Sequence, residues 1–354
     1  MNNKALLFKD KPIFGLDIGY GSIKVMQIET MTKKRSVVGY GAITFAPDAI
    51  KDGTIVDPEV IAAAAHELFS KQLVGDITTR RVILSLPAAK SFTRNVHLPK
   101  LKAKDLNDAI SAEIDQYIPM NRTELYVDHT VVREVAGELE HLIVAAPKRV
   151  VDSYMQIADI LNIEVVGIET TIDASSRLFV QAENSDVPTV LIDFGSTSAD
   201  LTIYDEGLVV TGTTPSGGDD FTNIIATTLK VSKQEAHIIK TKYGMGVSKK
   251  QKEITQGLSP ILQQIVKEIR RMIRYYEERA TDGRKISQVV TMGGGSNMPG
   301  LSEYLTSTLR LPTRTCDPWQ NLNFKKLQPP NMAEKAMYVT AAGLALTPPK
   351  ELFS

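Results

Sequence analysis

Residues 14–24 read Phe-Gly-Leu-Asp-Ile-Gly-Tyr-Gly-Ser-Ile-Lys, and residues 190–200 read Val-Leu-Ile-Asp-Phe-Gly-Ser-Thr-Ser-Ala-Asp. Both stretches share one plan. An apolar strand leads to an aspartate, Asp17 or Asp193, and then through glycine to small or polar residues typical of a tight turn. About half of the 354-residue chain separates the two aspartates. A repeat of this period predicts two related lobes, each opening with a β-hairpin.

The segments between the two copies predict an α/β organisation with an insertion. A strand over 36–45 and a helix over 58–73 follow the first hairpin. From residue 81 the pattern changes to short strands with two helices, over 104–117 and 148–161. We therefore expect an inserted α+β subdomain over 81–166. The expected bounds are 1–80 and 167–189 for the core of the first lobe, 190–345 for the second lobe and 346–354 for a C-terminal tail.

A long amphipathic helix is predicted in the second lobe. Ser259 and Pro260 are residues that favour the N-cap and the first turn, so the helix is expected to begin there. Apolar residues recur on one face as far as Tyr276, while charged residues occupy the other face. This pattern is typical of a helix that packs one face on a core and exposes the other to solvent.

The two turns suit phosphate binding when they face each other. Either turn alone is typical of an ordinary hairpin, but two of them across a cleft would direct several backbone N–H groups at one anion. The groups expected at phosphate belong to Gly19, Tyr20, Gly21 and Ser22 in the first turn and to Gly195, Ser196, Thr197 and Ser198 in the second. Asp17 and Asp193 would hold Mg²⁺ through its water shell, and Lys24 would reach a phosphate.

A third glycine site completes the expected nucleotide pocket. Gly293, Gly294 and Gly295 follow an apolar strand and lack Cβ atoms, so a flat ring or a ribose can lie on their backbone. The P-loop and dinucleotide motifs are absent, as are the GxSxG, HExxH and CxxC patterns. An ATP-type mononucleotide with Mg²⁺ is the ligand that remains.

Composition excludes several other classes of protein. Lys and Arg number 41, and so do Asp and Glu, so no net charge attracts the chain to nucleic acid. Cys316 is the single cysteine, which excludes an intrachain disulfide. No run of about 18 apolar residues occurs, and the first residues lack the apolar stretch of a signal peptide. We expect a cytoplasmic protein without direct membrane insertion.

At its hairpins the sequence resembles the superfamily of actin, hexokinase and heat-shock-chaperone ATPases. A narrower resemblance is carried by further motifs that cover nearly the whole chain. They include residues 98–100 (Leu-Pro-Lys), 113–119 (Glu-Ile-Asp-Gln-Tyr-Ile-Pro), 150–154 (Val-Val-Asp-Ser-Tyr), 268–271 (Glu-Ile-Arg-Arg) and 292–295 (Met-Gly-Gly-Gly). These motifs closely resemble PilM, the actin-like family of type IV pilus assembly.

The resemblance implies an actin-like, ribonuclease H-like two-lobed ATPase fold related to FtsA. It implies ATP and Mg²⁺ between the lobes, and a nucleoside near Gly217, Gly218, Lys240, Gly293, Gly294 and Gly295. Its main implied partner is the N-terminal cytoplasmic tail of PilN, held in a groove between the first lobe and the inserted subdomain. That partner would recruit the chain to the cytoplasmic face of the inner membrane. Other pilus platform or motor proteins and self-association are further implied contacts, and ATP would act as a switch by closing the lobes.

Two departures from the superfamily bear on catalysis. His237 stands where a nucleoside-contacting Glu is usual, three residues before Lys240. Thr171 aligns with a Glu that positions the attacking water in related proteins, and Thr is no base at neutral pH. Asp173 is a nearby substitute, so the catalytic residue stays open and at most slow hydrolysis is expected. Two alternatives also stay open, namely a small-molecule kinase and an FtsA-like membrane-associated filament protein, although a tail with two prolines leaves little room for an amphipathic anchor.

Overall fold

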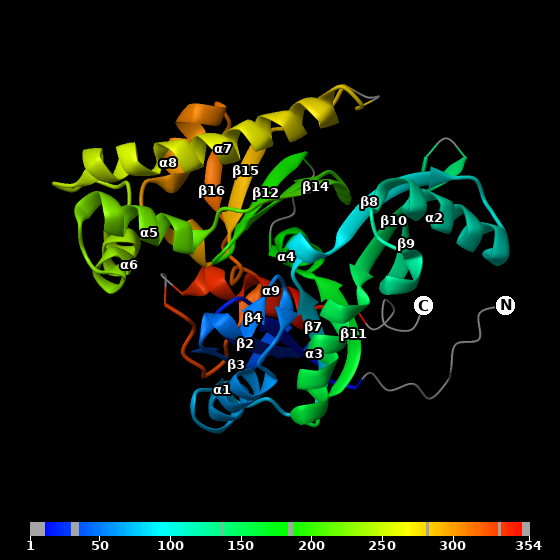
Figure 1. Cartoon of the computed structure of the whole chain (residues 1–354), viewed down its shortest axis with the longest axis horizontal. Helices are drawn as coiled ribbons and strands as arrows, with labels where there is room; N and C mark the ends of the chain where they lie inside the picture. Colours follow the sequence, from blue (N-terminus) through cyan, green and yellow to red (C-terminus); the bar gives the residue numbers. More distant parts are fainter. Residues whose placement is uncertain are drawn as a thin grey trace.

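The computed structural model describes residues 11–29, 35–135, 137–182, 187–280, 283–331 and 334–348. The predictions made for residues 1–10 and for 349–354 of the C-terminal tail therefore lie outside the described residues. Two large mixed sheets form the two lobes, and a smaller sheet stands to one side of them (Figure 1).

The first sheet has the strand order β11-β7-β1-β2-β3-β17, and β6 pairs with β3. Strands β1, β2 and β3 are antiparallel neighbours, whereas β7 and β11 run parallel to β1. Apolar residues occupy both faces of β1 and β7, as expected for strands covered on both sides. The strand bounds are β1 Phe14–Ile18, β2 Ser22–Glu29, β3 Arg35–Thr44, β6 Val74–Gly75, β7 Arg81–Leu86, β11 Glu164–Thr170 and β17 Leu322–Asn323.

The second sheet repeats this topology. Its order is β14-β13-β12-β15-β16, with an antiparallel β12–β13–β14 meander and with β15 and β16 parallel to β12. Its strands span β12 Thr189–Phe194, β13 Ala199–Tyr204, β14 Leu208–Thr214, β15 Gln288–Met292 and β16 Thr313–Thr315. The hairpins β1–β2 and β12–β13 occupy the same position in the strand order of their two sheets, so the repeat in the sequence is also a repeat in the structure.

Two helices lie between the sheets. Helix α4 (Thr171–Ala182) and helix α9 (Val339–Ala345) pack on each other, and α9 also packs on β1, β2 and β7. One apolar cluster joins Met26 of the first sheet and Phe179 of α4 to Leu191 and Val290 of the second sheet. The lobes therefore share one buried apolar layer, and α4 and α9 lie between the two sheets in Figure 1.

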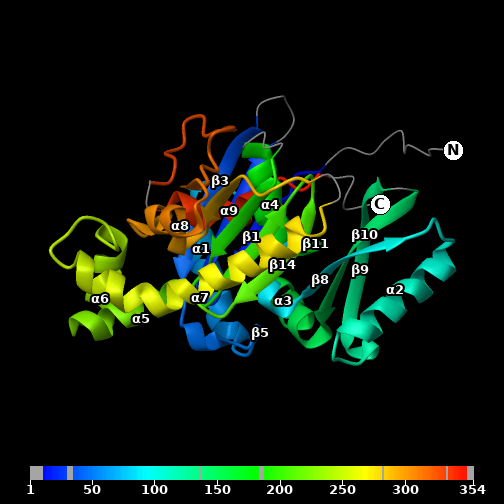
Figure 2. The ribbon, with the colours of Figure 1, turned by 90° about the horizontal axis from the view of Figure 1, so that it is seen from above.

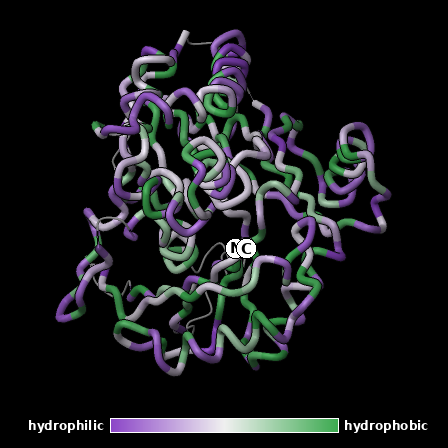
Figure 3. The backbone as a smooth tube through the Cα atoms, turned by 60° about the vertical axis from the view of Figure 1, so that its left-hand side comes forward, coloured by the Kyte–Doolittle hydropathy of each residue, from purple (hydrophilic) through white to green (hydrophobic). Residues whose placement is uncertain are grey.

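The outer faces are covered by separate groups of helices. Helices α1 (Pro58–Lys71) and α3 (Lys148–Ile160) pack on the first sheet, with Ile61, Leu68 and Tyr154 buried beneath them. The second sheet is covered by helices α5 (Gly218–Leu229), α6 (Lys233–Lys242), α7 (Gln251–Glu277) and α8 (Leu301–Leu309). Hydrophilic and hydrophobic residues alternate along the backbone of the surface helices (Figure 3). Short elements complete the chain: β4 Ile50–Lys51, β5 Thr54–Ile55, and the 3₁₀ turns η1 Pro47–Ala49, η2 Ala88–Lys90, η3 Arg122–Glu124, η4 Gly294–Asn297 and η5 Lys335–Tyr338.

The start of the long helix differs from the prediction. Helix α7 begins at Gln251, and Pro260 lies inside it rather than in its first turn. Ile254 and Leu258 are buried in phase with Leu262, so one continuous apolar stripe packs on the second sheet from the first turn onward. Burial of this stripe outweighs the missing N–H of the proline.

The inserted unit is smaller than predicted. It consists of the sheet β8-β10-β9 and helix α2, with bounds β8 Phe92–Leu98, β9 Leu125–Val135, β10 Glu138–Pro147 and α2 Ala103–Tyr117. It projects beside the lobes (Figure 2). Strands β7 and β11, which fall within the expected 81–166, belong to the first sheet instead. Parallel strands are usually buried on both faces, and β7 is buried along almost its whole length between β1 and β11.

The second lobe also ends earlier than the predicted 190–345. Strand β17 pairs with β3, and α9 packs on β1, so residues 322–345 return to the first sheet. We propose that the inserted unit spans 87–147 and that the closing segment of the chain belongs with the first lobe.

Candidate functional site

The first hairpin presents a paired carboxylate. Asp17 lies at the end of β1 and is 6% exposed. Its Oδ1 accepts a hydrogen bond from Ser85 Oγ at 2.7 Å, and its Oδ2 accepts one from Lys24 Nζ at 2.9 Å. Lys24 faces Asp17 directly across the β1–β2 pair. The turn between them is closed by a 3.0 Å hydrogen bond from Gly19 N–H to the Ser22 carbonyl.

The second hairpin presents a carboxylate in a different electrostatic state. Asp193 Oδ2 accepts a 2.8 Å hydrogen bond from Ser175 Oγ of α4. Burial raises the pKa of Asp193 to about 7, and the negative charges of Asp200 and Asp17 add to the rise. Lys24 opposes it. Charges act strongly only at short range in a protein, so Asp17 and Lys24 of the first hairpin and Asp200 of the second act together on the Asp193 carboxyl.

The two turns keep free backbone donors for an anion. Among the hydrogen bonds of the described residues, none uses the N–H groups of Tyr20, Gly21, Ser196 or Thr197 as donor. Ser196 and Thr197 are also exposed. Unpaired N–H groups of this kind in a turn bind phosphate oxygens well.

A third segment closes on the second turn. Gly218 N–H donates to the Gly195 carbonyl at 2.9 Å, and Asp219 N–H donates to the Ser196 carbonyl at 2.8 Å. A Cβ atom at Gly217 would overlap the carbonyl of Ser196, so glycine is required for this contact. The contact fixes the N-terminus of α5 against the turn after β12.

Lys240 and the triple glycine meet at the same place. Lys240 is 7% exposed, and its Nζ donates to the Gly218 carbonyl at 2.7 Å. Burial lowers the pKa of Lys240. Gly293 adopts φ 79°, and a Cβ there would overlap Asp193 Oδ1. A Cβ at Gly218 would lie 3.8 Å from the Gly295 Cα. The second-lobe residues expected at the nucleotide are therefore neighbours in space.

Asp200 is a site residue that the sequence reasoning missed. It lies opposite Asp193 across β12–β13. Its Oδ1 accepts a 2.8 Å bond from Thr213 Oγ1, and its Oδ2 accepts a 3.1 Å bond from Thr171 Oγ1. Burial raises the pKa of Asp200. A signal was present in the repeat, because Asp200 follows Asp193 by the interval at which Lys24 follows Asp17.

The chemistry of these donors suits a hydrated cation. Within the part of the chain that the structure describes, no three His, Cys, Asp or Glu side chains come close enough to hold a metal ion directly. Asp17 and Asp193 instead each accept a hydrogen bond from a serine hydroxyl and each precede a turn with unused N–H groups. Mg²⁺ keeps several waters and binds through one or two carboxylates plus phosphate oxygens, so this arrangement fits it.

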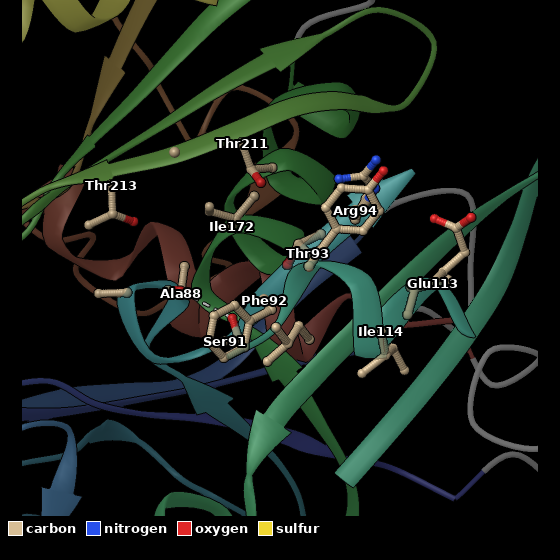
Figure 4. Close-up of a pocket in the computed structure, with 15 residues that line it drawn as sticks. Ala88, Ser91, Phe92, Thr93, Arg94, Glu113, Ile114, Ile172, Thr211 and Thr213 are labelled. Carbon is tan, nitrogen blue, oxygen red and sulfur yellow. Dashed lines mark hydrogen bonds between the residues drawn. The ribbon is translucent and has the colours of Figure 1, made fainter. Parts of the chain in front are cut away.

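A separate cavity of about 370 Å³ opens between the inserted unit and the lobes. Its walls come from β8, α2, the turn η2, the start of α4 and strand β14. Thr211 and Thr213 reach into it from β14, opposite Phe92 and Thr93 of β8 (Figure 4). Strands β8 and β14 are edge strands of their sheets, so the cavity lies between two strand edges.

Apolar, hydroxyl and charged side chains all line the cavity. Ile114, Ile143 and Ile172 line it, and Phe92 is 37% exposed. At the rim the Arg94 guanidinium lies 3.3 Å from the centroid of the Tyr117 ring, beside Glu113. An Asn95 side-chain amide joins the two strands by donating to the Leu208 carbonyl at 2.5 Å.

Sequence comparison decides the family. The sequence profile of type IV pilus assembly protein PilM matches residues 15–348. The chain belongs to the PilM family. Among curated relatives, cell division protein FtsA of Bacillus subtilis (strain 168) is 22% identical, over 97% of this chain and 83% of that protein.

Solved structures of similar fold agree with this assignment. A PilM-PilN type IV pilus biogenesis complex matches with a TM-score of 0.81 at 21% identity, over 94% of this chain and 97% of that one. MreB 5 of Spiroplasma citri bound to AMPPNP matches with a TM-score of 0.53 at 12% identity, over 95% of each chain. The PilM-family chain thus has the actin-like ATPase fold, related to FtsA, which confirms the predicted fold class. None of its described helices combines the length and apolar character of a membrane span.

This PilM-family chain differs from the actin-like superfamily at His237 and Thr171. His237 is exposed on α6, one turn before the buried Lys240. Thr171 Oγ1 donates a hydrogen bond to Asp200 and accepts one from Ala88 N–H at 3.2 Å, so the hydroxyl already acts both as donor and as acceptor. Asp173 accepts a 2.5 Å bond from Thr170 Oγ1, while its own N–H donates to the same oxygen. The Thr170 side chain therefore caps α4, and Asp173 lies in the first turn of that helix.

Proposed function

We propose that this chain is an ATP-binding, actin-like scaffold of the type IV pilus assembly platform, which binds the N-terminal cytoplasmic tail of PilN. One observation carries the nucleotide part. The aspartates of two repeated hairpins, Asp17 and Asp193, lie within electrostatic reach of each other, and each is followed by a turn with free N–H groups. The family match carries the pilus role.

In this proposal each lobe supplies one half of a phosphate site. Residues 19–22 with Lys24 contact phosphates from one side, and residues 195–198 contact them from the other. Gly217, Gly218, Lys240 and Gly293–Gly295 surround the nucleoside. Mg²⁺, when bound, neutralises phosphate charge, and Asp17 and Asp193 hold it through water.

We do not propose rapid ATP hydrolysis for this chain. A general base must lie within hydrogen-bond reach of the attacking water and carry a suitable pKa. Thr171 is not basic, and its hydroxyl is engaged by Asp200 and by Ala88 N–H. Asp173 is engaged by Thr170. Nucleotide binding therefore serves as a switch of conformation, with slow turnover at most.

The cavity beside the inserted unit supports the peptide part. An extended peptide can add to an exposed strand edge, which gives it backbone hydrogen bonds, while pockets receive its alternate side chains. Strand β8 offers such an edge, and the isoleucine-lined cavity next to it offers a pocket. The expected groove between the first lobe and the inserted unit thus gains a third wall, β14 of the second sheet. Binding of a PilN tail there would recruit the chain to the cytoplasmic face of the inner membrane, where other platform or motor proteins are further candidate partners.

Calorimetric titration with a synthetic N-terminal peptide of the same organism's PilN tests the peptide part. We expect saturable binding at one site per chain. Thr211→Trp should weaken binding at least tenfold because the indole would fill the cavity, whereas Thr211→Ser, which leaves the cavity open, should change it little. Equal affinities for the wild type and Thr211→Trp would contradict this location, and no binding by the wild type would contradict the partner.

A further inference from the structure

We propose that Asp200 couples the nucleotide cleft to the cavity beside the inserted unit, so that a nucleotide in the cleft changes the affinity of the cavity for an extended peptide. The inference rests on the proposed function and adds its regulation. It is carried by hydrogen bonds that run from one carboxylate to three walls of the cavity.

Asp200 belongs to the cleft by position. It lies directly opposite Asp193 in the β12–β13 register, so the two side chains share one face of the sheet. Its charge acts on Asp193 and also on Tyr20, which lies in the turn of the other hairpin. A phosphate group and a cation bound between the hairpins would therefore act on Asp200.

Asp200 also holds the walls of the cavity. Thr213, which lines the cavity from β14, donates to its Oδ1. Thr171, which precedes the lining residue Ile172 on α4, donates to its Oδ2. The Thr171 oxygen in turn accepts the N–H of Ala88, a lining residue of η2. Strand β14 and helix α4 thus meet on the Asp200 carboxylate, and turn η2 joins them through the Thr171 hydroxyl.

The connection runs from the second lobe to the start of the inserted unit. Asp200 and Thr213 belong to the second sheet, whereas Ala88 lies where β7 of the first sheet leads into the inserted unit. The walls of the cavity are divided in the same way, because β14 of the second lobe faces β8 and α2 of the inserted unit across it (Figure 4). Any closure of the lobes on a nucleotide changes the distance between these walls. If Asp200 turns toward the waters of a cation, the hydroxyls of Thr171 and Thr213 lose their acceptor, and the walls are released.

A binding cycle measures this coupling. The full chain is titrated with the PilN N-terminal peptide, alone and saturated with AMPPNP and magnesium, and the ratio of the two dissociation constants is the coupling factor. We expect a factor within the usual range of about 5–150 for the wild type, in either direction. Thr171→Val keeps the shape of the side chain but removes the hydroxyl, and it should bring the factor at least threefold closer to one. Thr171→Ser keeps the hydroxyl and should preserve the wild-type factor.

Thr213→Val and Thr213→Ser repeat the comparison from the other side of Asp200. Because the factor is a ratio within one protein, a direct effect of Thr213 on peptide affinity cancels. A wild-type factor of one, or a factor unchanged in both valine variants, would overturn the coupling while leaving the proposed function intact. A wild type that binds no peptide would overturn the peptide site and the coupling together.

Discussion

Asp193 gives the sharpest test of the cleft, because burial raises its pKa to about 7 from an ordinary value of 3.8. The folded protein therefore holds this proton more tightly than the unfolded chain does. Below pH ~3.8 both states are protonated and the carboxyl has no differential effect. As the pH rises to 7, ionisation destabilises the folded state progressively, at ~1.4 kcal/mol per pH unit. Above pH 7 the ionised carboxyl lowers the free energy of unfolding by a constant amount, about 4 kcal/mol.

Asp193→Asn replaces this carboxyl by a neutral group of the same shape. The free energy of unfolding of the ligand-free variant, relative to that of the wild type, should rise by about 2–3 kcal/mol from pH 5 to pH 8. Urea unfolding followed by the fluorescence of Trp319, the single tryptophan, gives both free energies. Asp159→Asn, which changes an exposed carboxylate on α3, is the control and should show no such trend. A stability difference that is the same at both pH values would refute the reasoning.

Three further outcomes follow from the same contacts. Lys24→Met should weaken ATP binding roughly 10- to 100-fold in calorimetry, because a hydrogen bond to a charged group contributes about 1.5–3 kcal/mol; unchanged affinity would remove Lys24 from the site. Gly217→Val should abolish nucleotide binding while the far-ultraviolet circular dichroism stays native, since its Cβ would overlap the Ser196 carbonyl; normal binding would show that the turn tolerates the shift. Leu262→Ala should cost about 2–5 kcal/mol in urea unfolding because Leu262 is fully buried, and a loss below 1 kcal/mol would contradict its place in the core.

The repeat made the fold predictable from sequence. Residues 14–24 and 190–200 share a pattern that requires only local chemistry, namely an apolar strand and a glycine turn. Both form hairpins, and the sheets around them have the same topology. In the first lobe Lys24 reaches Asp17, and in the second lobe Lys240 reaches the Gly218 carbonyl beside Gly295, and these contacts support the proposed nucleotide site.

Boundaries that depend on tertiary pairing were not predictable in this way. Residues 82–86 read as a short strand of either an insertion or a central sheet, and only the pairing of β7 with β1 and β11 decides between them. Pro260 favours a helix start when considered locally, but the stripe from Ile254 to Leu262 packs as one helix. In both places long-range burial overrides the local preference.

Contacts between distant segments account for the rest. Asp200 stood in the repeated motif, yet its role depends on Thr171 and Thr213, which lie on other elements. The cavity combines residues from 88 to 213, and no local pattern marks them as neighbours. A sequence motif identifies the groups that meet a ligand, whereas a cavity made by edge strands of two sheets appears only when the sheets are placed.

Hydrogen exchange measured by mass spectrometry, with and without magnesium and ATP, tests the central claim most directly. One nucleotide held between the lobes should slow exchange in peptides covering residues 18–24, 194–199 and 293–297 together, with the same dependence on ATP concentration. Protection confined to one lobe, or none at saturating ATP, would contradict a site shared by the two hairpins.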